Sequence, residues 1–131
     1  MIRMSLQTCL TLILAFLVTL SSPVAAQNAN NPAVLSGTVT DVRDGDTIEV
    51  GGIAIRLSAL DCPENGTQQG NQATKLAQQF QGTQAQCELT GAKSYDRLVG
   101  YCETNGTDFG AYMMNNSSCK VWEKYDVWDR Y

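Results

Sequence analysis

Apolar and polar side chains alternate at the start of the patterned part of the chain. Within residues 34–40, Leu35, Gly37 and Val39 fall on one face, and the Ser and Thr residues between them fall on the other. A period of two residues is typical of a half-buried β-strand. The turns and strands predicted next are, in order, Asp44-Gly45, Thr47–Val50, Gly51-Gly52 and Ile53–Leu57.

After Pro63, which cannot donate to a β-ladder, the spacing of apolar residues becomes helical. From Gln69 to Phe80 apolar side chains recur at i, i+3, i+4 and i+7, as on a surface helix that lies on a sheet. We expect a second hairpin from residues 84–89 and 98–103, and then a short helix capped by Thr107. This order predicts a mainly β fold with helices (α+β). Its centre would be a five-stranded antiparallel barrel, with one helix between strands 3 and 4 and a short helix after strand 5.

The first 26 residues have the pattern of a secretory signal peptide. Arg3 precedes an apolar run that ends in small residues at Val24-Ala25-Ala26. A membrane anchor is the alternative, but the run is shorter than the roughly 20 apolar residues that a span requires. Residues 27–33 are polar and predict a flexible leader. Residues 34–131 would form one monomeric domain, secreted or periplasmic, without stable membrane association once the signal is cleaved.

Removal of this signal leaves four of the five cysteines, and an even number in a small exported domain favours disulfides. Zinc is the alternative, but the mature chain has no C-x-x-C pair and no histidine. A hairpin centred on the Ser94-Tyr95 turn would set Cys87 opposite Cys102, within reach of a bridge. Cys62 and Cys119 would then pair with each other.

The mature chain is acidic. Arg3 is one of nine basic residues, so eight Lys and Arg residues remain against 13 Asp and Glu residues, and the net charge is −5. Non-specific affinity for nucleic acid comes mostly from basic side chains on phosphates. The charge therefore predicts weak general binding to nucleic acid, although it does not exclude chemistry on DNA.

The candidate chemistry is concentrated between Asp44 and Glu64. This stretch contains D-G-D-T around Asp46, I-R-L around Arg56, and D-C-P-E, which begins at Asp61. Carboxylates suit Ca²⁺, which takes several oxygen ligands. A guanidinium matches a pair of phosphate oxygens, and a glutamate that is free of the metal could take a proton from water. The combination predicts a metal-assisted phosphodiesterase.

These motifs, with Tyr95-Asp96-Arg97 in the second hairpin, resemble the staphylococcal nuclease (thermonuclease) family from about Leu35 to about Tyr125. The resemblance implies an OB-fold, whose strand faces and loops often meet nucleic acid. It implies Ca²⁺ as the cofactor and DNA as the substrate, with RNA as a second candidate. The implied calcium ligands are Asp46, Asp61 and the backbone carbonyl of Cys62.

The resemblance also implies that Glu64 activates the attacking water, and that Arg56 and Arg97 clamp the scissile phosphate. Tyr95 and Tyr125 would stack on or hydrogen-bond the substrate nucleotide. The chain departs from the family in its acidity and in two residues. Cys62 stands where the well-known member has threonine. Asp96, which would partly offset the charge of Arg97, stands where most members have glycine. It also stops at Tyr131, before the third helix that members usually have.

Each candidate residue has a structural alternative. D-G-D also suits a solvated turn, Glu64 and Arg97 suit exposed loops, and Arg56 suits an ion pair with Asp61 or Glu49. Tyr95 and Tyr125 suit packing about as well, and Trp122 and Trp128 look like packing residues. Asn65 and Asn105 fit the glycan acceptor pattern, but N-G-T also marks turns, which we prefer. The expected function is an exported calcium-dependent nuclease. The rivals are a catalytically silent OB-fold module that binds nucleic acid or a protein, and a calcium-binding structural domain.

Overall fold

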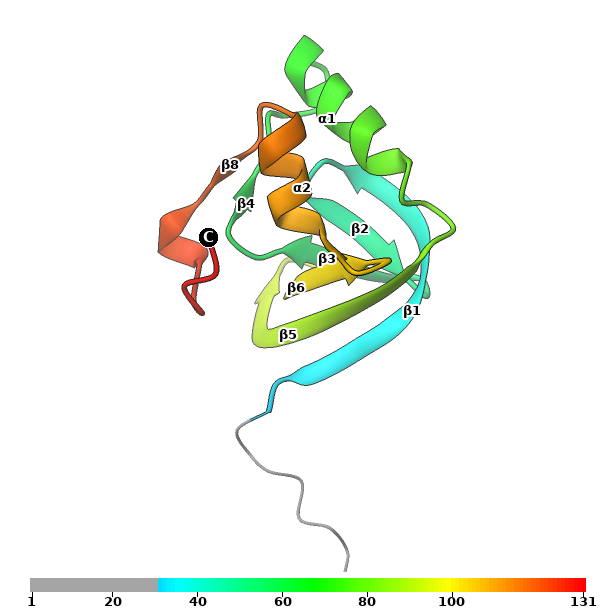
Figure 1. Cartoon of the computed structure of the whole chain (residues 1–131), viewed down its shortest axis with the longest axis vertical. Helices are drawn as coiled ribbons and strands as arrows, with labels where there is room; N and C mark the ends of the chain where they lie inside the picture. The colour runs from blue at the N-terminus through cyan, green and yellow to red at the C-terminus, as the bar shows by residue number, and fades with distance from the viewer. Residues whose placement is uncertain (1–30) are drawn as a thin grey trace, which may run out of the picture.

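The computed structural model describes residues 31–131, so the predicted signal peptide and most of the predicted leader lie outside the described residues. The chain is mainly β with two α-helices, an α+β arrangement (Figure 1). In chain order the elements are β1 (Ala33–Asp44), β2 (Thr47–Val50), β3 (Ile53–Leu57), β4 (Leu60–Asp61), α1 (Gln68–Gln78), β5 (Gln84–Ser94), β6 (Arg97–Thr104), β7 (Thr107–Asp108), α2 (Phe109–Asn116), β8 (Lys120–Val121) and the 3-10 turn η1 (Glu123–Tyr125).

Strands β2 and β3 have the predicted bounds, and Gly51 and Gly52 form the predicted turn between them. Both glycines have positive φ (56° and 78°), which a two-residue hairpin loop of this kind requires. In β1 the alternation predicted from Leu35 to Val39 gives way to a register shift after Val39. The shift brings Val42, three residues later, back into the core, and the strand runs on to the turn that holds Asp46.

The six-stranded sheet has the order β3-β2-β1-β5-β6-β7, and β3 also pairs with β6. This extra pairing is parallel and joins Ile55 to Leu98, whereas we expected only antiparallel pairs. It connects the first and the fifth strand of that order, so that β1, β2, β3, β6 and β5 pair in a closed ring. The second hairpin is longer than predicted, and its turn lies at Tyr95-Asp96.

Helix α1 runs from Gln68 to Gln78, two residues shorter at its end than predicted. Thr67 is its N-cap, and Phe80 lies beyond the last turn with its ring 5.0 Å from that of Phe109. The predicted cap of the second helix is wrong, because Thr107 belongs to β7. The N-cap is Asp108, whose carboxylate accepts the Ala111 N–H at 2.8 Å. An ionised carboxylate is a strong cap at a helix N-terminus.

The two helices lie beside each other over one end of the sheet, α1 against β1 and α2 against β6 (Figure 1). One apolar core, formed by residues of the strands and of both helices, fills the space between the helices and the sheet. Its largest fully buried apolar side chains are Phe109, Ile48, Ile55, Leu60, Met113, Val39 and Val50. No helix within residues 31–131 is long and apolar enough to cross a bilayer.

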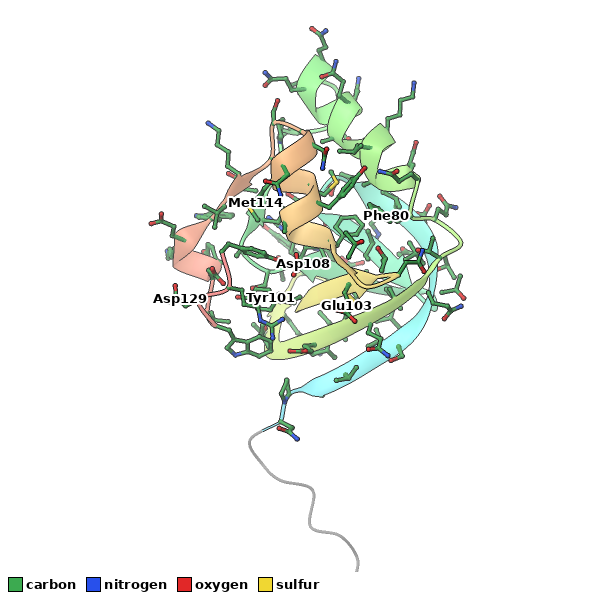
Figure 2. The ribbon with its side chains drawn as sticks, in the orientation of Figure 1. Phe80, Tyr101, Glu103, Asp108, Met114 and Asp129 are labelled. Carbon is green, nitrogen blue, oxygen red and sulfur yellow. A yellow bond between two sulfur atoms is a disulfide. The ribbon has the colours of Figure 1, made fainter. Side chains whose placement is uncertain are left out.

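Both predicted disulfides are present, Cys87–Cys102 and Cys62–Cys119. Two disulfides are consistent with a protein that folds outside the reducing cytosol. The segment after β8 is held against the sheet through Asp126, which accepts the Tyr101 hydroxyl at 2.7 Å, and through Trp128, whose ring stacks 5.0 Å from that of Tyr101. Figure 2 shows Tyr101 and Asp108 on the side of the molecule where this segment lies.

Candidate active site

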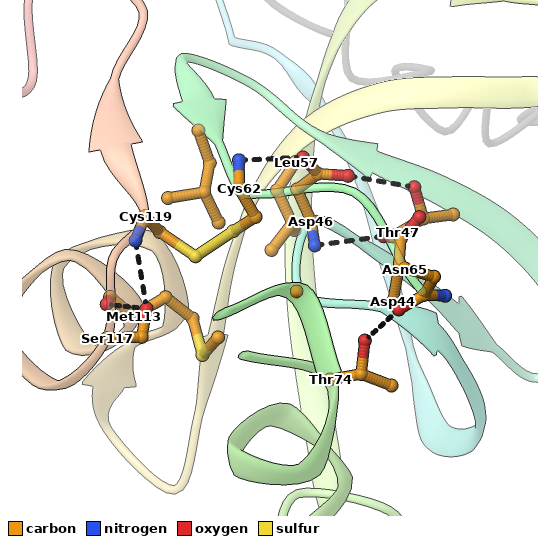
Figure 3. Close-up of a disulfide and its surroundings, with 12 residues drawn as sticks. Asp44, Asp46, Thr47, Leu57, Cys62, Asn65, Thr74, Met113, Ser117 and Cys119 are labelled. Atoms are coloured by element: carbon orange, nitrogen blue, oxygen red, sulfur yellow. Dashed lines mark hydrogen bonds between the residues drawn. A yellow bond between two sulfur atoms is a disulfide. The ribbon is translucent and has the colours of Figure 1, made fainter. Parts of the chain in front are cut away.

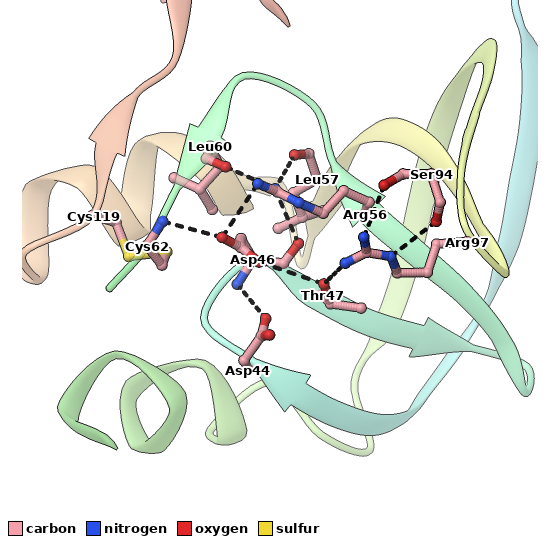
Figure 4. A network of polar contacts seen from close by, with 10 residues as sticks. All are labelled: Asp44, Asp46, Thr47, Arg56, Leu57, Leu60, Cys62, Ser94, Arg97 and Cys119. Atoms are coloured by element: carbon pink, nitrogen blue, oxygen red, sulfur yellow. Dashed lines mark hydrogen bonds and ion pairs between the residues drawn. A yellow bond between two sulfur atoms is a disulfide. The ribbon is translucent and has the colours of Figure 1, made fainter. Parts of the chain in front are cut away.

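Asp46 lies in the turn between β1 and β2, with its side chain directed to the loop after β4 (Figure 4). Its own N–H donates to the Asp44 carboxylate at 3.0 Å, which closes the D-G-D turn. Its Oδ2 atom accepts the Cys62 N–H at 3.1 Å. The two acidic motifs, separated by 16 residues, therefore meet at Asp46 and Cys62.

Arg56 points from β3 to the same place. Its Nη2 atom lies 3.4 Å from Asp46 Oδ2, and its Nη1 donates to the carbonyls of Leu57 and Leu60, each at 2.7 Å. The ion pairs considered from the sequence, with Asp61 or Glu49, are wrong. Three of the five guanidinium donors are engaged in this way, and the side chain keeps 15% of its surface exposed.

Arg97 reaches the same turn through Thr47. It is the half-buried first residue of β6, not the exposed loop residue that we expected. Its Nη1 donates to Thr47 Oγ1 at 3.0 Å, and its Nε and Nη2 donate to the carbonyl and hydroxyl of Ser94. One N–H on each Nη remains without a partner in residues 31–131, and a phosphate could accept hydrogen bonds from them.

Asp96 does not offset this charge by pairing with Arg97. Its carboxylate lies 2.9 Å from Arg43 Nη1, and Arg43 also pairs with Glu49 at 2.9 Å. The Arg43 hydrogen bond holds the pKa of Asp96 below its ordinary value, against the opposing effect of burial. Asp96 therefore fastens the tip of the β5–β6 hairpin to β1, with its charge neutralised by a different arginine.

Burial raises the pKa of Asp46 to about 7, against the opposing effect of Arg56. The hydrogen bond and charge of Asp44 raise this pKa further. Because the carboxylate loses hydration that Arg56 does not fully replace, a bound cation would stabilise its ionised form.

The donor set suits Ca²⁺ in its chemistry, since the carboxylates of Asp46 and Asp61 and the Cys62 carbonyl are all hard oxygen ligands. Within residues 31–131, however, no three Asp, Glu, His or Cys side chains lie close enough together to hold a metal. A calcium ion held by these three groups would need water molecules to complete its six to eight oxygen ligands.

Asp61 and Glu64 are both exposed. They line an open hollow of about 600 Å³ between the D-C-P-E loop and the segment before β8. Within the described part of the chain, the Glu64 carboxylate has no hydrogen-bond partner, and this hollow shares no lining residue with the groove beside Arg56. The structure thus gathers Asp46, Arg56 and Arg97, and leaves Glu64 free to reach a water molecule.

A second groove, of about 310 Å³, begins at Arg56 and passes between the β5–β6 hairpin and η1. Trp122 and Tyr125 form one wall with their rings 4.5 Å apart and edge to face, and each is 44% exposed. Tyr95 stands at the hairpin tip, 95% exposed and with a positive φ of 58°, and the Arg97 guanidinium lies 5.7 Å from its ring centre. A bulky residue held in such a backbone conformation is strained, and strain of this kind is concentrated at functional sites.

Comparisons of the sequence with protein-family models and with curated proteins found no match.

Three residues of this site were missed or misjudged from the sequence. Thr47 joins Arg97 to Asp46, because its hydroxyl donates to Asp46 Oδ1 at 3.4 Å and accepts from Arg97. Ser94 holds Arg97 with two acceptors, and Trp122 lines the groove instead of packing in the core. The signal for Thr47 was its place directly after D-G-D. Trp122 had none, since its exposure depends on where the C-terminal segment docks.

Proposed function

We propose that the protein is an exported, calcium-dependent nuclease of the staphylococcal nuclease type, in which the closed ring of β1, β2, β3, β6 and β5 is an OB-fold barrel. One observation carries the proposal. A buried carboxylate, Asp46, and two guanidinium groups, of Arg56 and Arg97, converge on one turn beside an aromatic groove. A calcium-binding structural domain would need the carboxylates but not the two arginines.

The phosphodiester would bind between the arginines. Arg97 offers one free N–H on each Nη, and Arg56 offers the donors that its carbonyl and carboxylate partners leave. Both groups are fixed by their protein partners before the substrate arrives. They would therefore stabilise charge as it develops on the phosphate oxygens with little reorganisation. The groove beyond Arg56 would take the base, against Trp122 and Tyr125.

Glu64 is the candidate general base. Its exposed carboxylate, without a hydrogen-bond partner in residues 31–131, can take a proton from water at Oε1 or Oε2. A calcium ion held by Asp46, Asp61 and the Cys62 carbonyl would polarise the phosphate and lower the pKa of nearby water. Pro63, which stands between Cys62 and Glu64, restricts the backbone of that loop and so limits the positions that Glu64 can reach.

The second candidate is a catalytically silent OB-fold module that binds nucleic acid or a protein. The internal bonds of Arg56 favour it, since three of its five donors already serve the fold. Either function is expected to show weak, mildly salt-sensitive binding, because the mature chain has eight basic residues against 13 acidic ones.

Cleavage separates the two functions. Oxidised, signal-free protein is incubated with end-labelled single-stranded DNA or RNA in Ca²⁺, in Mg²⁺ or in chelator, and the products are resolved by length. A nuclease of this type gives a ladder of cuts with Ca²⁺ and none with chelator. Binding by fluorescence anisotropy without any cut on either substrate would favour the silent module.

A further inference from the structure

The two disulfides join very different parts of the fold. Cys87 and Cys102 are paired neighbours in the β5–β6 hairpin, where ladder bonds on both sides already hold the strands together. Cys62 and Cys119 are 57 residues apart, and the β4–β8 ladder beside them has only two residue pairs. The second bridge therefore holds a junction that the backbone holds weakly.

One end of this bridge lies on the Asp46 turn. The Cys62 N–H donates to Asp46 Oδ2 at 3.1 Å, so the position of Cys62 sets the direction of that carboxylate (Figure 3). The Cys62 side chain also fills the space over Gly45, where an added Cβ would lie 3.0 Å from the Cys62 sulfur. Movement of Cys62 would release both Asp46 and the turn that contains it.

The other end leads into the wall of the groove. Two residues after Cys119 the chain leaves β8, and the Trp122 N–H donates to the Ala59 carbonyl at 2.6 Å. The Tyr125 carbonyl then accepts the Ser58 hydroxyl at 2.8 Å. The Cys62–Cys119 bridge thus stands between the carboxylates that would hold a cation and the aromatic side chains that would hold a base.

We propose that the Cys62–Cys119 bond is a redox gate on the site. The folded dithiol form has a loosened Asp46 turn and low calcium affinity, and only the bridged form is competent. This inference rests on the proposed nuclease function. An enzyme gated in this way stays silent in the reducing cytosol where it is made and becomes active on export.

The bridge, and with it the competent form, is made by thiol–disulfide exchange. The Cys62 and Cys119 thiols together lose two protons and two electrons, and the sulfur–sulfur bond forms between them. A disulfide oxidant of the exporting compartment, a small molecule or an oxidoreductase, accepts the electrons and protons and becomes two thiols. Both cysteines are buried in the bridged form, with 7% and 4% of their surfaces exposed, so the finished bridge resists attack by reductants.

Two double variants of the full chain test the gate. Cys62→Ser with Cys119→Ser removes the bridge. Cys87→Ser with Cys102→Ser is the matched control, which removes the disulfide within the β5–β6 hairpin. Calcium affinity by calorimetry and hydrogen exchange at the Asp46 and Cys62 amides are measured for each, and circular dichroism monitors the fold. We expect the first variant to stay folded, to bind Ca²⁺ at least about tenfold more weakly, and to lose exchange protection at Cys62. The control should match the parent in all three.

Three results would overturn the proposal. The first is a Cys62→Ser/Cys119→Ser variant with the calcium affinity and hydrogen exchange of the parent. The second is an equal loss of calcium affinity and exchange protection in the control variant. The third is global unfolding of the first variant, since a gate requires a folded dithiol form. The nuclease function is tested separately. If the parent binds Ca²⁺ but cuts no nucleic acid, the proposed nuclease function is wrong, and the calcium affinities of the variants still test the gate. If the variant without the Cys62–Cys119 bridge cuts nucleic acid like the parent, the gate is wrong and the nuclease function stands.

Discussion

Replacing Arg97 by alanine removes a guanidinium that has donors left over for a substrate phosphate. Two of its N–H groups are free for a phosphate, and the remaining three serve Thr47 and Ser94. Loss of one fixed donor to a developing oxyanion costs about 2.7–4 kcal/mol. We therefore expect Arg97→Ala to lower the single-turnover cleavage rate on the order of 10²–10³-fold.

The same change has a smaller effect on stability. The three lost hydrogen bonds come from an ionised donor, and such bonds are worth roughly 1.5–3 kcal/mol each when buried. Arg97 is only half-buried, and the Ser94 acceptors can bond water instead, which lowers the cost. The expected loss is about 1–2 kcal/mol, or roughly 4–16 °C in Tm for a domain of this size. Cleavage measured well below the parent's Tm, with circular dichroism on the same samples, separates the two effects.

Two control variants sharpen this result. Arg97→Lys keeps the charge but loses the planar fork, so its rate should lie between those of Arg97→Ala and the parent. Lys75→Ala removes one positive charge from the exposed face of α1 and should cut like the parent. If Arg97→Ala cleaves within about threefold of the parent under saturating Ca²⁺, Arg97 does not hold the phosphate and the reasoning fails.

Three further predictions follow from other residues. Glu64→Gln should lower the cleavage rate about 10²–10⁴-fold with no change in Tm, because the exposed carboxylate has no partner among residues 31–131. A parent-like rate would exclude Glu64 as the base. Trp122→Ala should raise KM by roughly 5- to 150-fold, equivalent to about 1–3 kcal/mol of lost stacking, with kcat nearly unchanged. An unchanged KM would show that the nucleotide base binds elsewhere. Burial raises the pKa of Asp126, but hydrogen bonds, from the Arg130 N–H and the Tyr101 hydroxyl among others, outweigh it and hold the pKa below its ordinary value. The C-terminal segment should therefore be fully docked above about pH 4, the ordinary pKa of an aspartate, and should detach as the pH falls through the lower pKa that Asp126 has in the folded protein. Tryptophan fluorescence should report this detachment, and Asp126→Asn should abolish the pH-dependent change.

Local patterns predicted the local structure. Strands β2 and β3 have the expected bounds because Gly51-Gly52 fixes both the turn and the register around it. The Cys87–Cys102 bridge follows from the same hairpin logic, since these residues pair directly across β5 and β6. In each case the deciding contacts lie within about fifteen residues along the chain.

Contacts between distant segments were not predictable in the same way. The parallel pairing of β3 with β6 depends on how the whole sheet curves, and no short motif encodes it. The structural alternative for Arg56 was an ion pair with Asp61 or Glu49, but its partner is Asp46, which lies in the β1–β2 turn. Asp96 was expected to weaken Arg97, but Arg43, 53 residues away along the chain, neutralises it instead.

The most direct measurement is the rate of single-turnover cleavage of single-stranded DNA by the oxidised, signal-free protein as Ca²⁺ is titrated, with Asp46→Asn measured in parallel. The account predicts no cleavage in chelator, a rate that saturates with Ca²⁺ in the parent, and a midpoint at least about tenfold higher in Asp46→Asn, which keeps the shape of the side chain but loses its charge. Absence of cleavage at every Ca²⁺ concentration, or the same rate in chelator as in Ca²⁺, would contradict it.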